Sequence, residues 1–518
     1  MTAPEVTETA VPARAGRREW VGLSVIALAC LLYSMDLTVL NLAVPALTRD
    51  LQPTASQLLW IVDIYGFMVA GLLITMGALG DRIGRRKLLL IGAAAFGVAS
   101  VIAAFSTSAA MLIVTRALLG IAGATLAPST LALIRNMFHD PEQRAVAIAI
   151  WVSCMSAGAA VGPVLGGALL QYFWWGSVFL MGVPVMLLLL AAGPFLLPEY
   201  RNPHLGPLDV WSALLSLASV LITILALKGA AEQGWSWPLL AYLAVGAALG
   251  AWFIQRQSRS ASPMIDLRLF RSPAFGAALA AYTLATFVAF GLLILVSQYM
   301  QIVLGMGPLA AGLWTIPFVV ALISGSMLSP WVARRFGASR TMAAGMLLAA
   351  TGFALLAQVG TDVSPLMLVI AFIVYALGLS PVFTLATDLI VGAASAERAG
   401  SASALAETGA ELGGALGIAV MGSVGMAIYR LDMAPLSLPT LPAQAAAQAR
   451  ATLGGAASAA EQLGGAAGPA LLAGAKSAFV HGLHWAAWLA AALMVVMSVW
   501  VLIARPDTSA DPAGRAAH

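Results

Sequence analysis

The segment Gly77-Ala78-Leu79-Gly80-Asp81-Arg82-Ile83-Gly84-Arg85-Arg86-Lys87 separates two long apolar runs of the chain. These eleven residues contain one acid, four bases and three glycines. Loops this rich in bases stay on the cytoplasmic side of a membrane. Glycines allow two helix ends and a tight turn to approach closely. The segment therefore predicts a short cytoplasmic turn between two membrane-spanning helices.

Composition places the whole chain in the membrane. Its 518 residues are 61% hydrophobic and only 9% charged, with a mean hydropathy of +0.93, whereas soluble domains carry roughly 25% charged residues. The net charge of +4 does not indicate nucleic-acid binding, because the bases lie in short loops. Cys30 and Cys154 lie in apolar runs, which excludes a disulfide framework or a cysteine metal site. No P-loop, haem or metal-ligand spacing occurs, so we expect no enzyme activity, cofactor or bound metal.

The apolar runs predict an all-α membrane protein with fourteen spans, each of about 20 residues. With both termini placed in the cytoplasm, most of the 26 Lys and Arg residues fall in cytoplasmic segments, and Arg116 alone lies well inside a span. Lys228 is counted among the few outer bases. The predicted spans are 20–43, 56–79, 88–106, 109–133, 144–170, 176–197, 209–229, 237–256, 274–302, 310–333, 340–359, 364–391, 400–428 and 475–504.

A weak internal repeat predicts how the spans are grouped. Asp81-Arg82-Ile83-Gly84 has an echo in Arg334-Arg335-Phe336-Gly337, eight spans later. Two pseudo-symmetric six-span halves with two inserted spans explain that offset. An extracellular helical hairpin is expected within residues 431–474, with a floppy loop as the alternative. The predicted parts are an N-terminal tail (1–19), a first bundle (20–200), the inserted helices (201–260), a second bundle (261–504) and a C-terminal tail (505–518).

The opening segment resembles the G-x-L-x-D-R-x-G-R-[RK] loop of the major facilitator superfamily, and the span arrangement resembles the fourteen-span drug:proton antiporters of that family. The resemblance implies two halves that rock about a central site. It also implies a conformational gate in the loop, in which Asp81 pairs with a base or a helix N-terminus in one state. The gate residues of this loop are Gly77, Asp81, Arg82, Gly84, Arg85 and Arg86.

Asp36 lies well inside the first predicted span, in Met35-Asp36-Leu37-Thr38-Val39. A carboxylate at such a depth costs about 2.5–3.5 kcal/mol, so it is expected to face a wet cavity or a partner. The phrase resembles the [LM]-D-x-T-[VI] signature of the same antiporters, which implies binding of protons and substrate. A structural acid that is satisfied by hydroxyls such as that of Thr38 is the alternative.

Asp63 lies in the second predicted span, in Trp60-Ile61-Val62-Asp63-Ile64-Tyr65. Trp60 and Asp63 share a helix face. An acid beside aromatic rings attracts a lipophilic cation, so Trp60, Asp63 and Tyr65 are candidate substrate contacts. The phrase resembles the QacA-type quaternary-ammonium exporters. The alternative is an interfacial aromatic belt with an acid at its edge.

Arg116 stands in Arg116-Ala117-Leu118-Leu119-Gly120, at a depth close to that predicted for Asp36 and Asp63. An unpaired guanidinium there is costly, so an acid is expected nearby. The phrase resembles the R-x-x-x-G motif of the fourth span, which implies a role in proton coupling. A static ion pair is the alternative.

The fifth predicted span contains a glycine-rich string, in which small residues allow close helix packing and a proline interrupts the backbone hydrogen bonds. The spacing resembles the G-x-x-x-G-P-x-x-G-G motif of the superfamily's antiporters, which implies export and a role in the conformational gate. A plain packing face explains only its first two glycines. The residues concerned are Gly158, Gly162, Pro163, Gly166 and Gly167.

Glu407 and Glu411 share one face of the thirteenth predicted span. Two carboxylates so placed repel each other, so at least one is expected to be protonated or paired with a cation. The internal repeat aligns this span with the glycine-rich fifth span, near the central interface. The pair is therefore a second candidate site for protons or cationic substrate, and a solvated pair near the inner mouth is the alternative.

These features together predict a proton-coupled exporter of lipophilic, cationic drugs that resides as a monomer in a bacterial inner membrane. The predicted proton-coupling residues are Asp36, Arg116, Glu407 and Glu411. The three acids among them, Asp36, Glu407 and Glu411, are also predicted to contact substrate. Its partners are expected to be small molecules, protons and lipid, without nucleic acid. A dedicated exporter of one antibiotic or metabolite, or a non-transporting membrane sensor, remains an alternative.

Overall fold

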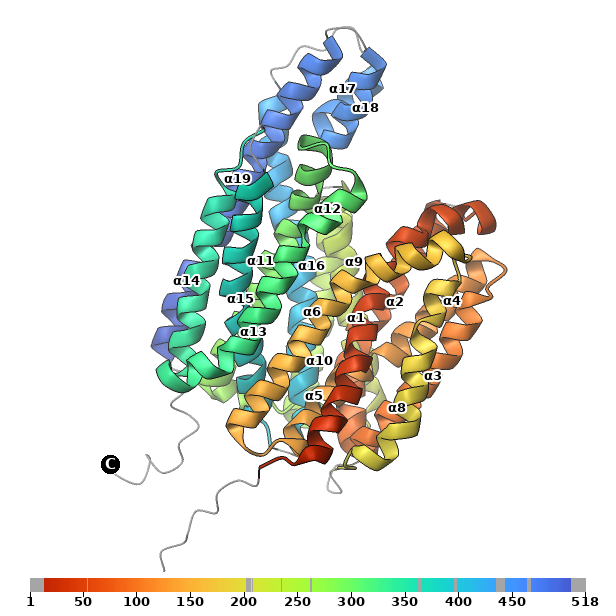
Figure 1. Cartoon of the computed structure of the whole chain (residues 1–518), viewed down its shortest axis with the longest axis vertical. Helices are drawn as coiled ribbons and strands as arrows, with labels where there is room; N and C mark the ends of the chain where they lie inside the picture. Colours follow the sequence, from red (N-terminus) through yellow and green to blue (C-terminus); the bar gives the residue numbers. More distant parts are fainter. Residues whose placement is uncertain are drawn as a thin grey trace, which may run out of the picture.

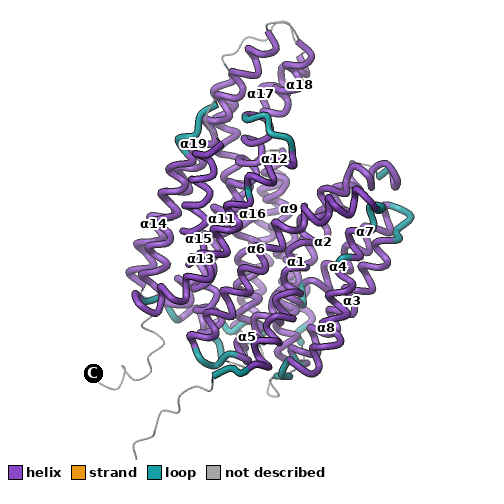
Figure 2. The backbone as a smooth tube through the Cα atoms, in the orientation of Figure 1, coloured by secondary structure: helices purple, strands orange, loops and turns teal. Residues whose placement is uncertain are grey.

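The computed structural model describes residues 14–53, 55–201, 206, 208–233, 235–260, 263–361, 365–395, 398–434, 443–463 and 467–504. These residues form helices joined by short loops, and no strand occurs among them (Figure 2). The predicted all-α class is confirmed. The predicted tails, 1–19 and 505–518, lie largely or wholly outside the described residues.

The helices form two groups that lie side by side, with a helix pair between them in sequence (Figure 1). The first group is α1 (Arg17–Leu51), α2 (Ala55–Ile83), α3 (Arg85–Ala104), α4 (Ala109–Gly123), α5 (Leu126–Met137), α6 (Pro141–Tyr172), α7 (Ser177–Leu180) and α8 (Gly182–Leu196). The pair is α9 (Val210–Gln233) and α10 (Trp237–Arg259). The second group is η1 (Leu267–Arg271), α11 (Pro273–Gln298), the π-helical turn η2 (Tyr299–Val303), α12 (Pro308–Trp314), α13 (Ile316–Phe336), α14 (Ala338–Leu356), α15 (Pro365–Ala393), α16 (Ala399–Met433), α17 (Ala443–Ala451), α18 (Leu453–Leu463) and α19 (Ala467–Ala504).

Thirteen stretches of helix in the described part of the chain are long and apolar enough to cross a membrane. Each overlaps one of thirteen of the fourteen predicted spans, with bounds that differ by several residues. The remaining predicted span, 144–170, falls within the 32-residue helix α6. Asp140 caps α6, since its side chain accepts a hydrogen bond from the Glu142 amide, and Pro141 follows at the first helical position.

Helix packing repeats between the two groups, as the predicted pseudo-symmetry requires. Within the first group α1 packs against α6, and within the second α11 packs against α16. The groups meet where α2 packs against α16 and α6 packs against α13. Each group encloses its own large hydrophobic cluster. Helix α9 packs against both α2 and α16, so it reaches the junction between the groups.

Both described ends of the chain lie at one end of the molecule, where α1 begins and α19 finishes (Figure 1). We call this the inner end. The turn at Gly84 lies there too, because Arg18 of α1 donates to the Phe195 carbonyl and Arg86 donates to the Pro194 carbonyl. The basic turn and the two described chain ends thus share one side of the molecule, as the charge pattern predicts.

Two short helices occupy the segment predicted as a hairpin. The α17 and α18 helices pack against each other at the end opposite the inner end (Figure 1). The Tyr429 hydroxyl donates to the Ala449 carbonyl at 2.7 Å and fixes α17 to α16. Helix α19 begins at Ala467, well before the predicted start at 475, and extends its apolar span outward. Residues 435–442 and 464–466 lie outside the described residues.

Small residues bring α1 and α6 together. A Cβ atom added at Gly158 would overlap the Leu31 carbonyl oxygen of α1, and one at Gly166 would overlap the Val39 side chain. Gly162 is buried, whereas Gly167 is exposed. Of Pro163 only the helical backbone is described. Two glycines of the string, Gly158 and Gly166, therefore serve packing against α1.

We expect Gly158→Ala to destabilise the folded protein by about 1–3 kcal/mol, because the added methyl overpacks the α1–α6 contact. Gly167→Ala is the matched control, since an exposed helical glycine replaced by alanine gains up to about 1 kcal/mol. Thermal unfolding of both variants in detergent checks this. Equal melting temperatures would show that the α1–α6 contact relaxes without cost.

Candidate functional site

The Asp36 carboxylate of α1 forms an ion pair with Arg116 of α4. Arg116 Nη1 lies 2.7 Å from Asp36 Oδ2, and the two side chains are only 2% and 10% exposed. Arg116 Nε also donates to the Ile61 carbonyl, and the guanidinium lies 4.7 Å from the centre of the Tyr65 ring. The acid expected beside Arg116 is therefore Asp36. The side chain of Thr38, the alternative partner, lies outside the described residues.

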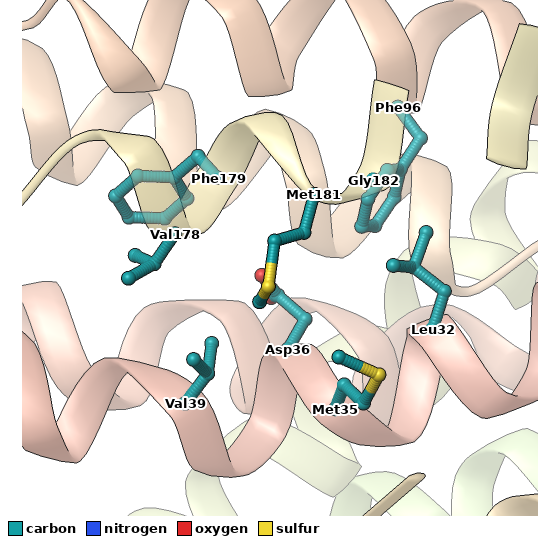
Figure 3. Close-up of a pocket in the computed structure, with 9 residues that line it drawn as sticks. All are labelled: Leu32, Met35, Asp36, Val39, Phe96, Val178, Phe179, Met181 and Gly182. Carbon is teal, nitrogen blue, oxygen red and sulfur yellow. The ribbon is translucent and has the colours of Figure 1, made fainter. Parts of the chain in front are cut away.

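Asp36 borders a small, mostly apolar pocket (Figure 3). Its walls come from α1, α3, α7 and α8, and Asp36 points from α1 toward Met181. All four helices belong to the first group, so the ion pair is enclosed within that group rather than between the two. The other residues that line the pocket are Leu32, Met35, Val39, Phe96, Val178, Phe179 and Gly182.

Asp63 of α2 faces away from the Asp36–Arg116 pair, toward α9. Its carboxylate forms an ion pair with the Lys228 ammonium of α9. The same ammonium lies 4.9 Å from the centre of the Phe67 ring, and Phe67 packs edge to face with Trp60. Tyr65, by contrast, is fully buried against Arg116, and no hydrogen-bond partner of its hydroxyl occurs among the described residues. Helix α2 thus divides the predicted substrate contacts between two environments.

Glu407 and Glu411 lie on α16, where the second group meets the first. Glu407 is 6% exposed, and the Tyr282 hydroxyl of α11 donates to its Oε1 at 3.4 Å. Glu411 lies within electrostatic range of Tyr33 and Tyr65 of the first group. Within the described part of the chain, neither glutamate forms an ion pair. Two neighbouring carboxylates therefore lie at the junction with no direct ionic partner among the described residues, and the Lys228 ammonium of α9 acts on Glu411 from a longer distance.

Asp81 receives both kinds of partner that the loop motif implies. Arg85 Nη2 donates to Asp81 Oδ1 at 2.7 Å, and both side chains are almost completely buried. Asp81 also accepts from the backbone amides of Gly400 and Ser401, at 3.2 and 3.1 Å, and from the Ser401 hydroxyl. These amides belong to the first turn of α16, where an anion is favoured. One carboxylate thus holds the N-terminus of α16 against α2.

The other loop residues complete this contact. A Cβ atom on Gly77 would lie 2.6 Å from the Gly400 carbonyl oxygen, so only glycine allows α2 to approach α16 this closely. Gly84 has a φ of +109°, a conformation that favours glycine. Arg82 donates to the Gly206 carbonyl at 2.9 Å, and Arg86 donates to backbone carbonyls at the end of α8.

Two further ion pairs join the groups at the inner end. Arg144 Nε lies 2.6 Å from Asp388 Oδ1, and Arg334 Nη1 lies 3.1 Å from Glu142 Oε2. The first pair joins α6 to α15 and the second joins α6 to α13, and both pairs of helices are in contact. With Asp81, which joins α2 to α16, they close the inner end.

The sequence alone does not identify Lys228 or Tyr282 as site residues. Lys228 lies near the C-terminal end of α9, and its ammonium pairs with the Asp63 carboxylate. An ammonium that follows an uncharged apolar run is the signal that could have identified it. Tyr282 lies in an apolar helix, and nothing in the sequence separates it from other buried tyrosines.

The chain is similar to known transporters over nearly its whole length. The model of the Major Facilitator Superfamily matches residues 26–418. The multidrug efflux pump LfrA of Mycolicibacterium smegmatis is 43% identical, with 95% of this chain and 97% of that protein covered. The methyl viologen resistance protein SmvA of Salmonella typhimurium is 36% identical (94% and 99% covered), and the tetracenomycin C resistance and export protein of Streptomyces glaucescens is 34% identical (96% and 93% covered).

Among solved structures, the human organic anion transporter MFSD10 superposes with a TM-score of 0.62 at 16% identity, covering 93% of this chain and 99% of that one. At this identity the likeness concerns the fold alone. The family is one of membrane transporters rather than enzymes, and the bacterial relatives place the chain in the inner membrane as a multi-pass protein. The chain belongs to the Major Facilitator Superfamily.

Proposed function

We propose that this transporter exports lipophilic, cationic drugs in exchange for protons. The observation that carries the proposal is the pair Glu407 and Glu411, two carboxylates at the junction of the groups that form no ion pair within the described part of the chain. The relatives named as a multidrug efflux pump and a methyl viologen resistance protein support the direction of transport and the class of substrate.

The physical argument is one of charge compensation. A carboxylate held away from water is costly unless a proton neutralises it or a cation pairs with it. Among the described residues, the Tyr282 hydroxyl is the one hydrogen-bond partner of the Glu407 carboxylate, at 3.4 Å. A proton and a drug cation therefore compete for the same carboxylates. Protons that arrive from the outside release the drug there, and loss of those protons to the cytoplasm prepares the site for the next drug molecule.

Rocker-switch alternating access accounts for the rest of the site. The contacts of Asp81 with α16 hold the inner end closed, and their release opens it to the cytoplasm. Protonation of Asp36 weakens its bond to Arg116 and couples the first group to the proton gradient. Trp60 and Asp63 contact the drug, and Tyr65 reaches it only after a rearrangement, since it is fully buried here. The gradient alone drives the cycle, without a cofactor, in a monomer.

Ethidium uptake into inside-out vesicles, with and without an imposed proton gradient, tests the proposal. Wild type is expected to show gradient-driven uptake, and Glu407→Gln is expected to reduce it at least about tenfold, as is usual when a proton-transfer group is removed. Glu461→Gln, which changes an exposed glutamate on α18, is the matched control and is expected to transport normally. Equal ethidium uptake with and without the proton gradient, or full activity of Glu407→Gln, would contradict proton coupling at Glu407.

A dedicated exporter of one antibiotic is the second candidate. The 34% identity to the tetracenomycin C resistance and export protein favours it. Transport assays with a panel of cationic dyes and neutral antibiotics separate the two proposals, because a dedicated exporter transports one compound of the panel and does not transport ethidium.

A further inference from the structure

Lys228 occupies a site that has the chemistry of an organic-cation receptor. Its ammonium pairs with the Asp63 carboxylate and lies 4.9 Å from the centre of the Phe67 ring. Phe67 in turn packs edge to face with Trp60, with ring centres 6.2 Å apart. A carboxylate beside aromatic faces attracts lipophilic cations by charge and by cation–π attraction. The site thus already holds a cation, and that cation belongs to the chain.

The position of Lys228 follows from how α9 packs. Val220 and Ile224 of α9 form a hydrophobic cluster with Phe67 and Ala70 of α2, and this cluster extends to α16. Lys228 lies one helical turn beyond Ile224, so its side chain emerges directly above Phe67. It is also within electrostatic range of Glu411 on α16. The ammonium therefore lies where α9, α2 and α16 meet.

The pair is arranged so that it can separate. The Lys228 side chain is 39% exposed and that of Asp63 is 23% exposed, so their attraction is partly screened. Lysine carries its charge on a flexible four-carbon stem, which can leave a partner without movement of the helix. Trp60 is 42% exposed, which leaves apolar ring surface for a lipophilic cation to cover, whereas Phe67 is only 6% exposed.

We propose that Lys228 is a tethered competitor for the cation site formed by Trp60, Asp63 and Phe67, and that a drug cation binds there by displacing it. Lys228 then determines specificity: a cation with a large apolar surface gains enough contact to displace the ammonium, and a small hydrated cation does not. This inference rests on the proposed export of lipophilic cations, and it names the residue that selects among them.

Equilibrium binding of tetraphenylphosphonium to the purified full-length protein at one fixed pH tests the proposal. If Lys228 leaves the site free in about a tenth of the molecules, Lys228→Gln binds the probe about tenfold more tightly than wild type. Adding Asp63→Asn to Lys228→Gln is expected to abolish the gain. Lys228→Arg keeps the competing charge and is expected to show no gain. Lys476→Gln removes the same charge from a lysine that donates to the Val303 carbonyl, and is also expected to show no gain.

A second measurement uses the wild type alone and does not depend on the folding of any variant. The chain has three lysines, Lys87, Lys228 and Lys476. Displacement frees the Lys228 amine, so tetraphenylphosphonium is expected to increase its modification by an amine-reactive reagent, as followed by mass spectrometry. The other two lysines serve as internal references.

The outcomes separate this inference from the proposed function. If wild type and Lys228→Gln bind the probe equally, or if the gain persists with Asp63→Asn, the competitor role is wrong while cation export stands. If neither protein binds the probe, the competitor role and the proposed substrate class both fail. A rise in affinity that depends on Asp63, together with increased labelling of Lys228, supports the proposal.

Discussion

Replacing Arg116 with methionine is expected to abolish transport and to destabilise the folded protein by about 3–5 kcal/mol. The substitution leaves the Asp36 carboxylate in an apolar environment without its partner at 2.7 Å. Breaking a buried pair on one side is costly because the remaining charge is uncompensated. Thermal unfolding in detergent and gradient-driven ethidium uptake measure the two effects separately.

The double variant Asp36→Asn with Arg116→Met distinguishes charge balance from coupling. It removes both charges, so we expect most of the lost stability to return, while transport stays absent because no proton-binding group remains at position 36. Recovery of transport by the double variant would show that the pair is a static structural element, the alternative considered from the sequence.

The Asp209–Arg256 pair supplies the control for this experiment. Its side chains are 22% and 43% exposed. Hydrogen bonds from Arg256 lower the pKa of the Asp209 carboxyl to about 2, so the contribution of this acid is present above its ordinary pKa and is lost only as the pH falls toward 2. The pair is therefore fully charged at the pH of the assay. Arg256→Gln is expected to leave transport unchanged, because solvent replaces the lost contact.

Asp81→Ala is expected to shift the population from the closed inner end to an open one. Asp81 accepts three hydrogen bonds from Gly400 and Ser401, and these exist only while α2 and α16 are in contact. Hydrogen bonds to a charged group contribute about 1.5–3 kcal/mol each. Together the three bonds contribute about 4.5–9 kcal/mol, and reversing a 99:1 population takes roughly 5.5 kcal/mol. Their loss falls short of a full reversal only at the lower end of this range, so an intermediate shift is the smallest result expected.

Distances between spin labels at the inner end measure this shift. His139 and Phe336 are exposed and belong to different groups, so His139→Cys and Phe336→Cys in a variant without native cysteines report on opening. Glu199→Gln is the control, because Glu199 pairs with Arg86 at 3.7 Å within the first group and both side chains are about one-third exposed. An Asp81→Ala variant with wild-type distances would show that the other inner ion pairs close this end unaided.

Much of the architecture was predictable because a membrane imposes one-dimensional rules. The length of apolar runs indicates where helices cross, and the bases of the segment Gly77–Lys87 indicate which end is cytoplasmic. The need of Arg116 for a nearby acid also follows from its depth alone. The predicted span 144–170 lies within α6, and the predicted span 400–428 begins one residue after the start of α16.

The partners within the site depend on rotation about each helix axis, which apolar runs do not encode. Asp36 and Asp63 have similar predicted depths, yet one faces Arg116 inside the first group and the other faces Lys228 of α9. Tyr65 and Asp63 are two residues apart, and a step of two in a helix turns the side chain by about 200°. Sequence proximity therefore suggested one shared substrate site where the structure has two environments.

The sequence by itself predicted the long apolar helices, the side of the molecule that holds the basic turn and the presence of buried charges, since each of these follows from the cost of placing a residue in lipid. Only the tertiary structure decided that Arg116 pairs with Asp36, that Asp81 caps α16 and that Lys228 fills the site at Asp63. These contacts join residues far apart in the chain. They arise from how helices rotate and dock, and many neighbouring helix faces are equally apolar and give no signal of that choice.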